Sequence, residues 1–186
     1  MILKKNYLKN MANTKGLIAY YSRKGQNYVG GSIVNLSVGN TEVIAKKIQE
    51  LTGSDLFEID TIKPYPKDYT ETTYVAIDEK KKNARPEITA AVDNMDSYDV
   101  IYLGYPNWWG TFPMGVFTFL ESYDFSRKII IPFCTHEGSG MGNSERDIKK
   151  SCPNSNVLHG LAIRGGSVGR ADNEVSSWIK NNLKQL

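Results

Sequence analysis

The chain has 186 residues, of which 40% are apolar and 11% aromatic, enough for a single globular domain with its own core. Its formal charge is +3, but three lysines and no acids lie in the first ten residues, so the net charge from Met11 onward is zero. A near-neutral body argues against a nucleic-acid-binding protein, and two cysteines are too few for a disulfide framework.

The first residues, 1–14, are predicted to be a disordered tail that precedes one domain over residues 15–186. The opening is basic, and its few apolar residues are too scattered for a signal peptide or a membrane span. Together with the low cysteine content, this predicts a cytoplasmic protein without a membrane partner.

Four short segments are almost continuously apolar, as strands covered on both faces must be. They span residues 16–22, 99–105, 128–134 and 157–163, and we expect them to be central parallel strands. Residues 54–60 form a shorter, more polar segment, which favours an edge strand.

Apolar residues at helical spacing predict helices over 43–51, 116–120 and 175–183. A weaker helix is expected to begin near Tyr69 and to end in the charged run before Pro86. Another begins at Asn143 or Ser144, with Asp147 placed as the partner in a capping box. Strands that alternate with helices predict an open, doubly wound α/β sheet, whose ligands bind beyond the carboxyl ends of the strands.

The first loop at that edge contains Ser22, a glycine-containing segment over residues 23–38, and then Gly39-Asn40-Thr41 at the start of a helix. Backbone N–H groups at a helix start, with hydroxyl and amide side chains, can bind a phosphate without a lysine. Asn40 and Thr41 are also favoured residues for simple helix capping. The Walker A and GxGxxG patterns are absent, which argues against a nucleoside triphosphatase and a Rossmann dinucleotide site.

The loop after the third strand reads Pro106-Asn-Trp-Trp-Gly110, a sharp turn from which two adjacent indoles must diverge. If one ring packs inward, the other is free for a flat apolar ligand or for a partner surface. The loop after the fourth strand, Thr135 to Gly142, is rich in glycine, so its backbone can approach a ligand closely. Phosphate donors, a flat aromatic face and accessible backbone at one edge of the sheet indicate one shared ligand.

With these loops, the sequence from about Lys15 to the C-terminus resembles the flavodoxins, in particular the branch in which the third-strand loop reads Pro-x-Trp-Trp-Gly. The resemblance implies a flavodoxin-like three-layer sandwich with a five-stranded parallel sheet of order 2-1-3-4-5 and a bound FMN. It further implies low-potential electron transfer that cycles through a flavin semiquinone, redox partner proteins, and a monomer or weak dimer.

The same resemblance assigns cofactor contacts by position, with no catalytic residue and no metal. The phosphate side comprises Ser22, Arg23, Gly39, Asn40 and Thr41, and the ring side comprises Pro106, Asn107, Trp108, Trp109, Gly110, Thr135, His136, Glu137, Gly138, Ser139 and Gly140. Two features depart from the family. The phosphate loop is split by residues 23–38, which leaves open whether Arg23, Gln26 or Asn27 touches FMN, and the chain lacks the acidic character that steers basic partners to typical flavodoxins.

Other functions fit parts of the sequence less well or equally well. An FMN-dependent NAD(P)H oxidoreductase acting on quinones or similar acceptors fits the same fold, as does a domain that has lost its cofactor. Residues 165–169 match the nucleophile-elbow pattern around Ser167, but no histidine follows it, so we interpret this segment as a strand-to-helix turn. The cysteines and histidines match no zinc spacing. We expect Cys134 and His159 to be buried in strands and Cys152 to be a loop thiol.

Overall fold

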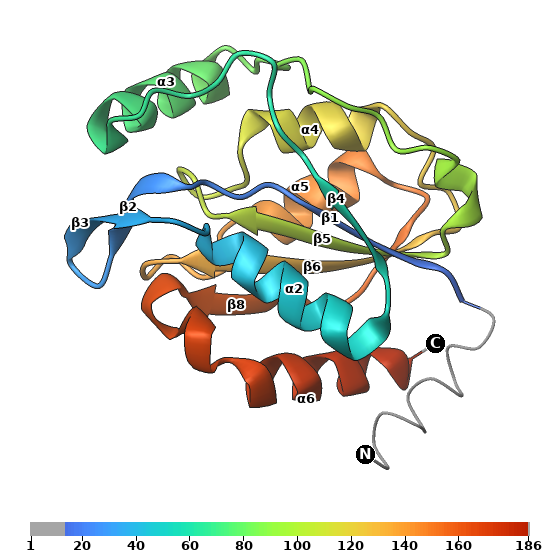
Figure 1. Cartoon of the computed structure of the whole chain (residues 1–186). Coiled ribbons are helices and arrows are strands. Elements are labelled where there is room, and N and C mark those ends of the chain that lie inside the picture. Colours follow the sequence, from blue (N-terminus) through green and yellow to red (C-terminus); the bar gives the residue numbers. More distant parts are fainter. Residues whose placement is uncertain (1–13, 186) are drawn as a thin grey trace.

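The structure is a computed structural model and describes residues 14–185 (Figure 1). The tail predicted over residues 1–14 therefore lies outside the described residues, apart from residue 14.

The centre of the molecule is a parallel sheet in the order β4-β1-β5-β6-β7, with β8 also paired to β6. Its strands are β1 (Gly16–Tyr20), β4 (Asp55–Glu58), β5 (Val100–Pro106), β6 (Ile129–His136), β7 (Asn156–Val157) and β8 (Leu161–Arg164). Because β7 and β8 are two parts of one fifth strand, this arrangement confirms the flavodoxin-like fold and the strand order 2-1-3-4-5.

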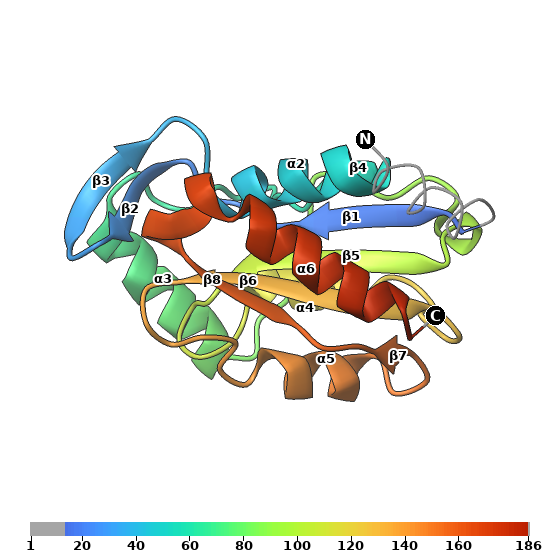
Figure 2. The same ribbon diagram turned by 90° about the horizontal axis from the view of Figure 1, so that it is seen from below.

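Helices cover both faces of the sheet, as Figures 1 and 2 show. One face is covered by α2 (Asn40–Thr52) and α6 (Asp172–Leu183), and the other by α4 (Met114–Glu121) and α5 (Ser144–Ser151). The remaining elements are α3 (Tyr69–Lys81), the short 3-10 helices η1 (Met95–Ser97) and η2 (Gly165–Arg170), and a hairpin described below. All five predicted helices are present.

The core has two parts because each strand has apolar side chains on both of its faces. Leu17 and Ala19 of β1 pack on the α4 and α5 side with Phe119, whereas Ile18 packs on the α2 and α6 side with Ile48. All are at most 1% exposed, and burying each large aliphatic or aromatic side chain stabilises the fold by about 1.5–3 kcal/mol. This explains why the strands contain continuous apolar runs.

The prediction of one central strand over residues 157–163 was wrong. The segment is broken into β7 and β8 and lies at the edge of the sheet. Between them, the N–H of Gly160 donates to Glu145 Oε1 at 2.8 Å, and a Cβ at Gly160 would lie 2.4 Å from Met141 Cε. His159 is exposed rather than buried in a strand, because this contact with α5 takes the chain out of the ladder.

The capping box predicted at α5 does not form. The Ser144 hydroxyl donates to the Met141 carbonyl at 2.6 Å and bonds the Tyr105 hydroxyl at 2.9 Å, while Asp147 accepts a hydrogen bond from Thr111 at 2.7 Å. Tertiary contacts therefore replace the local cap.

Both cysteines are buried and free, which confirms the expectation for Cys134 in β6, whereas Cys152 is the buried C-cap of α5. Within residues 14–185 there is no cluster of potential metal ligands. In the same residues, no helix is long and apolar enough to cross a membrane.

The segment over residues 23–38 folds as an antiparallel hairpin of β2 (Gly25–Val29) and β3 (Ser32–Leu36). Gly30 and Gly31 form its two-residue turn, with φ of 60° and 97°, as tight hairpin turns that require positive φ favour. The hairpin projects beyond the end of β1, next to α3 (Figure 1).

Candidate cofactor site

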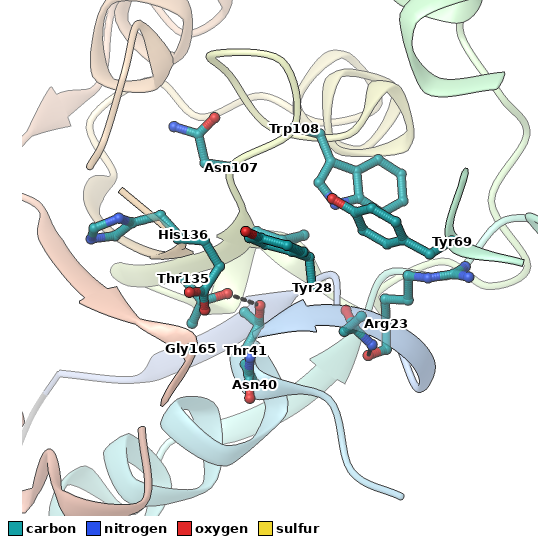
Figure 3. Close-up of a pocket in the computed structure, with 13 residues that line it drawn as sticks. Arg23, Tyr28, Asn40, Thr41, Tyr69, Asn107, Trp108, Thr135, His136 and Gly165 are labelled. Atoms are coloured by element: carbon teal, nitrogen blue, oxygen red, sulfur yellow. Dashed lines mark hydrogen bonds between the residues drawn. The ribbon is translucent and has the colours of Figure 1, made fainter. Parts of the chain in front are cut away.

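Two adjoining cavities lie beyond the carboxyl ends of β1, β5 and β6. The polar cavity, of about 120 Å³, is lined by the start of α2 and the loops after β5, β6 and β8 (Figure 3). The aromatic cavity, of about 300 Å³, lies between the tryptophan loop and α3. Both are lined by Arg23, Asn27, Tyr69, Asn107 and Trp108, so they form one continuous site.

The polar cavity is built around the first turn of α2. The backbone N–H of Glu42 donates to Ser22 Oγ at 3.0 Å, and a Cβ at Gly39 would lie 2.2 Å from that same oxygen, so only glycine permits this packing. Helix geometry leaves the N–H groups of Asn40 and Thr41 without intrahelical acceptors. The start of α2 can therefore bind an anion with its backbone.

Side chains join this helix start to the loop after β6. The hydroxyl groups of Thr41 and Thr135 share a hydrogen bond of 2.8 Å, drawn as a dashed line in Figure 3. Both residues are at most 4% exposed. The two loops are thus held at a fixed separation across the cavity.

Gly165, at the start of η2, closes the polar cavity from a third side. A Cβ there would lie 2.4 Å from both Asn40 Nδ2 and Glu137 Oε1, so the absent side chain leaves room for both groups. Glu137 Oε2 accepts a hydrogen bond from the Gly30 N–H at 3.1 Å. Its Oε1 is buried and has no hydrogen-bond partner among the described residues. Among the lining residues that the structure describes, this carboxylate is the one acidic group and would oppose an anion.

His136 contributes an imidazole to the same wall. Its Nδ1 accepts a hydrogen bond from the Gly138 N–H at 2.9 Å. Burial and, secondarily, the charge of Arg164 lower the pKa of His136, so the ring is neutral at physiological pH. The anion-binding capacity of the cavity therefore comes from backbone and amide dipoles and from the Arg23 guanidinium, rather than from a histidine cation.

The aromatic cavity owes its shape to the two neighbouring indoles, which diverge as expected. Trp108 packs edge-on against Tyr21 and Tyr65, with ring centroids 5.4 and 5.0 Å away. Trp109 has φ of 54° and is 51% exposed. Its indole N–H donates to the Thr73 carbonyl of α3 at 3.0 Å. One ring is therefore anchored in the core and the other extends to α3.

Asn107 fixes the turn that separates these rings. Its Oδ1 accepts from the Gly110 N–H at 3.0 Å, and its Nδ2 donates to the Gly140 carbonyl at 2.8 Å. Gly110 has φ of 85°, which favours glycine. The tryptophan loop and the glycine-rich loop after β6 are therefore held together by one amide side chain.

The hairpin supplies the outer wall of both cavities. Tyr28 stacks on Tyr69, with ring centroids 6.2 Å apart, and Figure 3 shows both rings beside the cavity. The Arg23 guanidinium donates to the carbonyls of Pro66 and Lys67 at 2.9 and 3.0 Å. Gln26 Oε1 instead accepts from the Tyr69 N–H at 2.8 Å. Of the three insertion residues left open by the sequence, Arg23 and Asn27 line the cavities and Gln26 does not.

Ten of the residues assigned from the sequence line the cavities: Arg23, Asn40, Thr41, Pro106, Asn107, Trp108, Trp109, Thr135, His136 and Glu137. Six others lie in the surrounding loops without lining either cavity: Ser22, Gly39, Gly110, Gly138, Ser139 and Gly140. Six further lining residues are not predicted by the sequence: Tyr28, Tyr69, Thr72, Thr73, Ala76 and Gly165. The paired glycines at 165–166 were a usable signal, but the others depend on how the hairpin and α3 fold back over the site.

A doubly wound sheet with a ligand site at the switch point between β1 and β5 defines a flavodoxin-like α/β protein. The chain belongs to the flavodoxin family: the family model described as Flavodoxin matches residues 32–182. The match begins within the hairpin, so β1 and Ser22 lie outside it. A comparison with curated protein sequences found no match.

Solved structures agree with this assignment. A Bacteroides eggerthii DSM 20697 protein, provisionally named a flavoprotein, is 28% identical with a TM-score of 0.72, over 91% of this chain and 98% of that one. A flavoprotein from Lactobacillus acidophilus NCFM, solved in complex with FMN, is 26% identical with a TM-score of 0.64, over 89% and 99% of the two chains. An archaeal flavodoxin, 15% identical with a TM-score of 0.51 over 91% and 99%, shares the fold.

Proposed function

We propose that this protein binds FMN across the two joined cavities and acts as an electron carrier. The main support is that a polar cavity at a helix N-terminus joins an aromatic cavity, with five residues lining both. FMN has the matching pair of ends, a phosphate dianion and a flat ring. The Lactobacillus flavoprotein solved with FMN supports this choice of ligand.

The residues present fit the phosphate end. The close approach of Ser22 to Gly39 and the space left by Gly165 form a cradle that a Cβ at either glycine would fill. The N–H groups of Asn40 and Thr41 would donate to the phosphate, and the Thr41–Thr135 bond would hold the donors in place. Among the described residues that line this cavity, Glu137 alone is acidic, so its carboxylate would have to turn away from the phosphate.

The aromatic cavity fits the ring end. Trp108, Trp109 and Tyr69 supply apolar faces, and Asn107 and Arg23 supply polar atoms at the edge. Bound FMN would supply reversible electron transfer, while the chain would orient the ring and exclude water from it. Trp109 lines this cavity and is held to α3 through its indole N–H, so it would cover part of the ring face on which a nicotinamide must stack. This favours a carrier over an NAD(P)H-dependent enzyme.

The test begins with absorption and fluorescence titrations of the purified protein with FMN and riboflavin. We expect FMN to bind much more tightly, because riboflavin lacks the phosphate that the start of α2 would hold. Stopped-flow mixing of the loaded protein with NADPH should then give no direct reduction. Failure to bind FMN would refute the cofactor assignment, and rapid reduction by NADPH would identify an oxidoreductase instead.

A further inference from the structure

A third hollow, which we call the cationic groove, lies on the α4 and α5 side of the sheet and shares no lining residue with the two cavities. It has a volume of about 500 Å³ and lies between the end of α3, α4 and α5. Met114 and Phe117 contribute apolar surface, and Lys80, Arg85, Arg146 and Lys150 are the cations that line it. Figure 1 shows the three helices on one side of the sheet.

The two acidic residues of the groove already have partners. Glu121 receives two hydrogen bonds of 2.7 Å from the Arg85 guanidinium, which lower the pKa of Glu121. Arg85 also lies over the Phe117 ring, 4.9 Å from its centroid. Asp147 accepts the Thr111 hydroxyl at 2.7 Å. Arg85 and Glu121 therefore cancel each other and form part of the wall.

The other three cations are weakly compensated. Among residues 14–185, no carboxylate lies within ion-pair distance of Lys80 or Lys150. Arg146 makes one ion pair, to Asp147 at 3.5 Å, and its side chain is 73% exposed. On a chain whose net charge from Met11 onward is zero, this is a local concentration of positive charge.

The cationic groove adjoins the aromatic cavity through one contact. The Lys80 ammonium donates a hydrogen bond to the carbonyl of Trp109, and Trp109 lines the aromatic cavity. The indole of Trp109 is half exposed. A protein seated on the groove would therefore cover the residue that borders the proposed ring site. Tryptophan and arginine side chains are also the types that most often dominate binding at protein interfaces.

We propose that the cationic groove is the docking surface for an acidic segment of a redox partner, an inference that rests on the proposed electron-carrier function. The cations come from two separate helices, α3 and α5, and are long and exposed, which suits an extended carboxylate-rich surface rather than a small anion. Positive charge beside the ring site would steer such a partner toward it. The polarity is opposite to that of typical acidic flavodoxins.

The experiment is an NMR titration of the full-length, isotope-labelled protein with decaglutamate at low salt, with decalysine as the control probe. The groove variant combines Lys80→Gln, Arg146→Gln and Lys150→Gln. A matched variant removes the same charge elsewhere through Arg170→Gln, Lys180→Gln and Lys184→Gln, on η2 and at the end of α6. FMN affinity is measured on every sample.

Decaglutamate should shift the amide signals around residues 80, 146 and 150 and the indole N–H of Trp109, and high salt should weaken binding. The groove variant should bind about tenfold more weakly, since exposed ion pairs each contribute little and three act together, while the matched variant should bind as the wild type does.

Equal loss in both variants would show a general charge effect and overturn the proposal. The same holds if inorganic phosphate saturates the groove signals more tightly than the peptide, which would show a small-anion site. If the peptide binds but FMN does not, the docking surface stands and the carrier function is refuted. If FMN binds but the peptide does not, the docking surface is refuted and the carrier function stands.

Discussion

At the scale of single residues, the hydrogen bond between Thr41 and Thr135 is the link that holds the polar cavity together. Thr41→Ala leaves a buried hydroxyl of Thr135 without its partner. We expect the free energy of unfolding to fall by about 1–3 kcal/mol, as measured by urea denaturation, together with weaker FMN binding. Thr41→Ser keeps the hydroxyl and should lose much less. Equal losses in both variants would attribute the effect to the methyl group instead.

Glu137 provides a second prediction at this scale. Its buried Oε1 lies beside Gly165 and Asn40, where an anion would bind. Glu137→Gln removes a negative charge, which would repel the phosphate of FMN, and keeps an acceptor for the Gly30 N–H. FMN binding should become tighter by about 1 kcal/mol or more, because charges at short range in a partly buried site interact strongly. Riboflavin affinity should change less.

Isothermal titration calorimetry of the wild type, Glu137→Gln and the control Glu174→Gln would measure this effect. Glu174 is exposed in the first turn of α6, so its variant carries the same change in net charge away from the cavity. A gain in FMN affinity in both variants would point to net charge rather than to the carboxylate in the cavity.

At the scale of elements, substitutions at two glycines of η2 test whether the junction of β8 and η2 shapes the polar cavity. Gly165→Ala would place a methyl group 2.4 Å from Asn40 Nδ2 and Glu137 Oε1, so these two side chains must turn to new positions in the cavity. Because both atoms are the ends of flexible side chains, the cost should lie toward the lower end of the ~1–3 kcal/mol typical of overpacking. We expect a lower melting temperature and a large loss of FMN affinity.

The control for this variant is Gly169→Ala in the same 3-10 helix. Gly169 does not have positive φ, and an added Cβ there would have no neighbour within 4 Å. It should leave both quantities close to those of the wild type. If Gly165→Ala also behaves like the wild type, the close contacts around Gly165 do not shape the cavity.

The elements also show what the sequence can predict. Continuous apolar runs predict β1, β5 and β6 because both faces of these strands are buried, and the loops that follow them supply most of the site. The Gly30-Gly31 pair is a usable signal for the hairpin turn, but no residue of its two strands is buried. Its position over the site could not be predicted, because it is held by distant contacts such as Gln26 to Tyr69 and Gly30 to Glu137. The break between β7 and β8 likewise depends on Glu145.

At the scale of the whole molecule, the stability of the fold depends on tyrosine side chains that are buried on both faces of the sheet and in the loops at its edge. Burial and nearby carboxylates raise the pKa of Tyr20 and Tyr98 to about 12. Burial raises the pKa values of Tyr21, Tyr65 and Tyr105 further. These residues lie in or beside β1, β5 and the walls of the aromatic cavity, so ionisation of phenols opposes the whole fold rather than one element.

The sign of this effect predicts alkaline unfolding. In the unfolded chain each phenol releases its proton near pH 10, whereas the native state retains it up to about pH 12 at Tyr20 and Tyr98. The unfolded state therefore binds fewer protons in this interval, and stability must fall as pH rises. The contribution of these phenols is intact below pH 10 and is lost progressively between pH 10 and 12.

Tyr98→Phe tests this explanation, because it removes one such phenol together with its 2.8 Å hydrogen bond to Asp55. The variant should be less stable than the wild type at neutral pH by about 1 kcal/mol, yet lose less stability between pH 10 and 12, so that the two curves converge. Tyr74→Phe, at a side chain that is 68% exposed, should follow the wild type throughout. Urea denaturation at stepped pH gives these curves. If the Tyr98→Phe curve instead runs parallel to that of the wild type, replacing this phenol has not reduced the loss of stability between pH 10 and 12. The alkaline loss of stability would then arise from other groups.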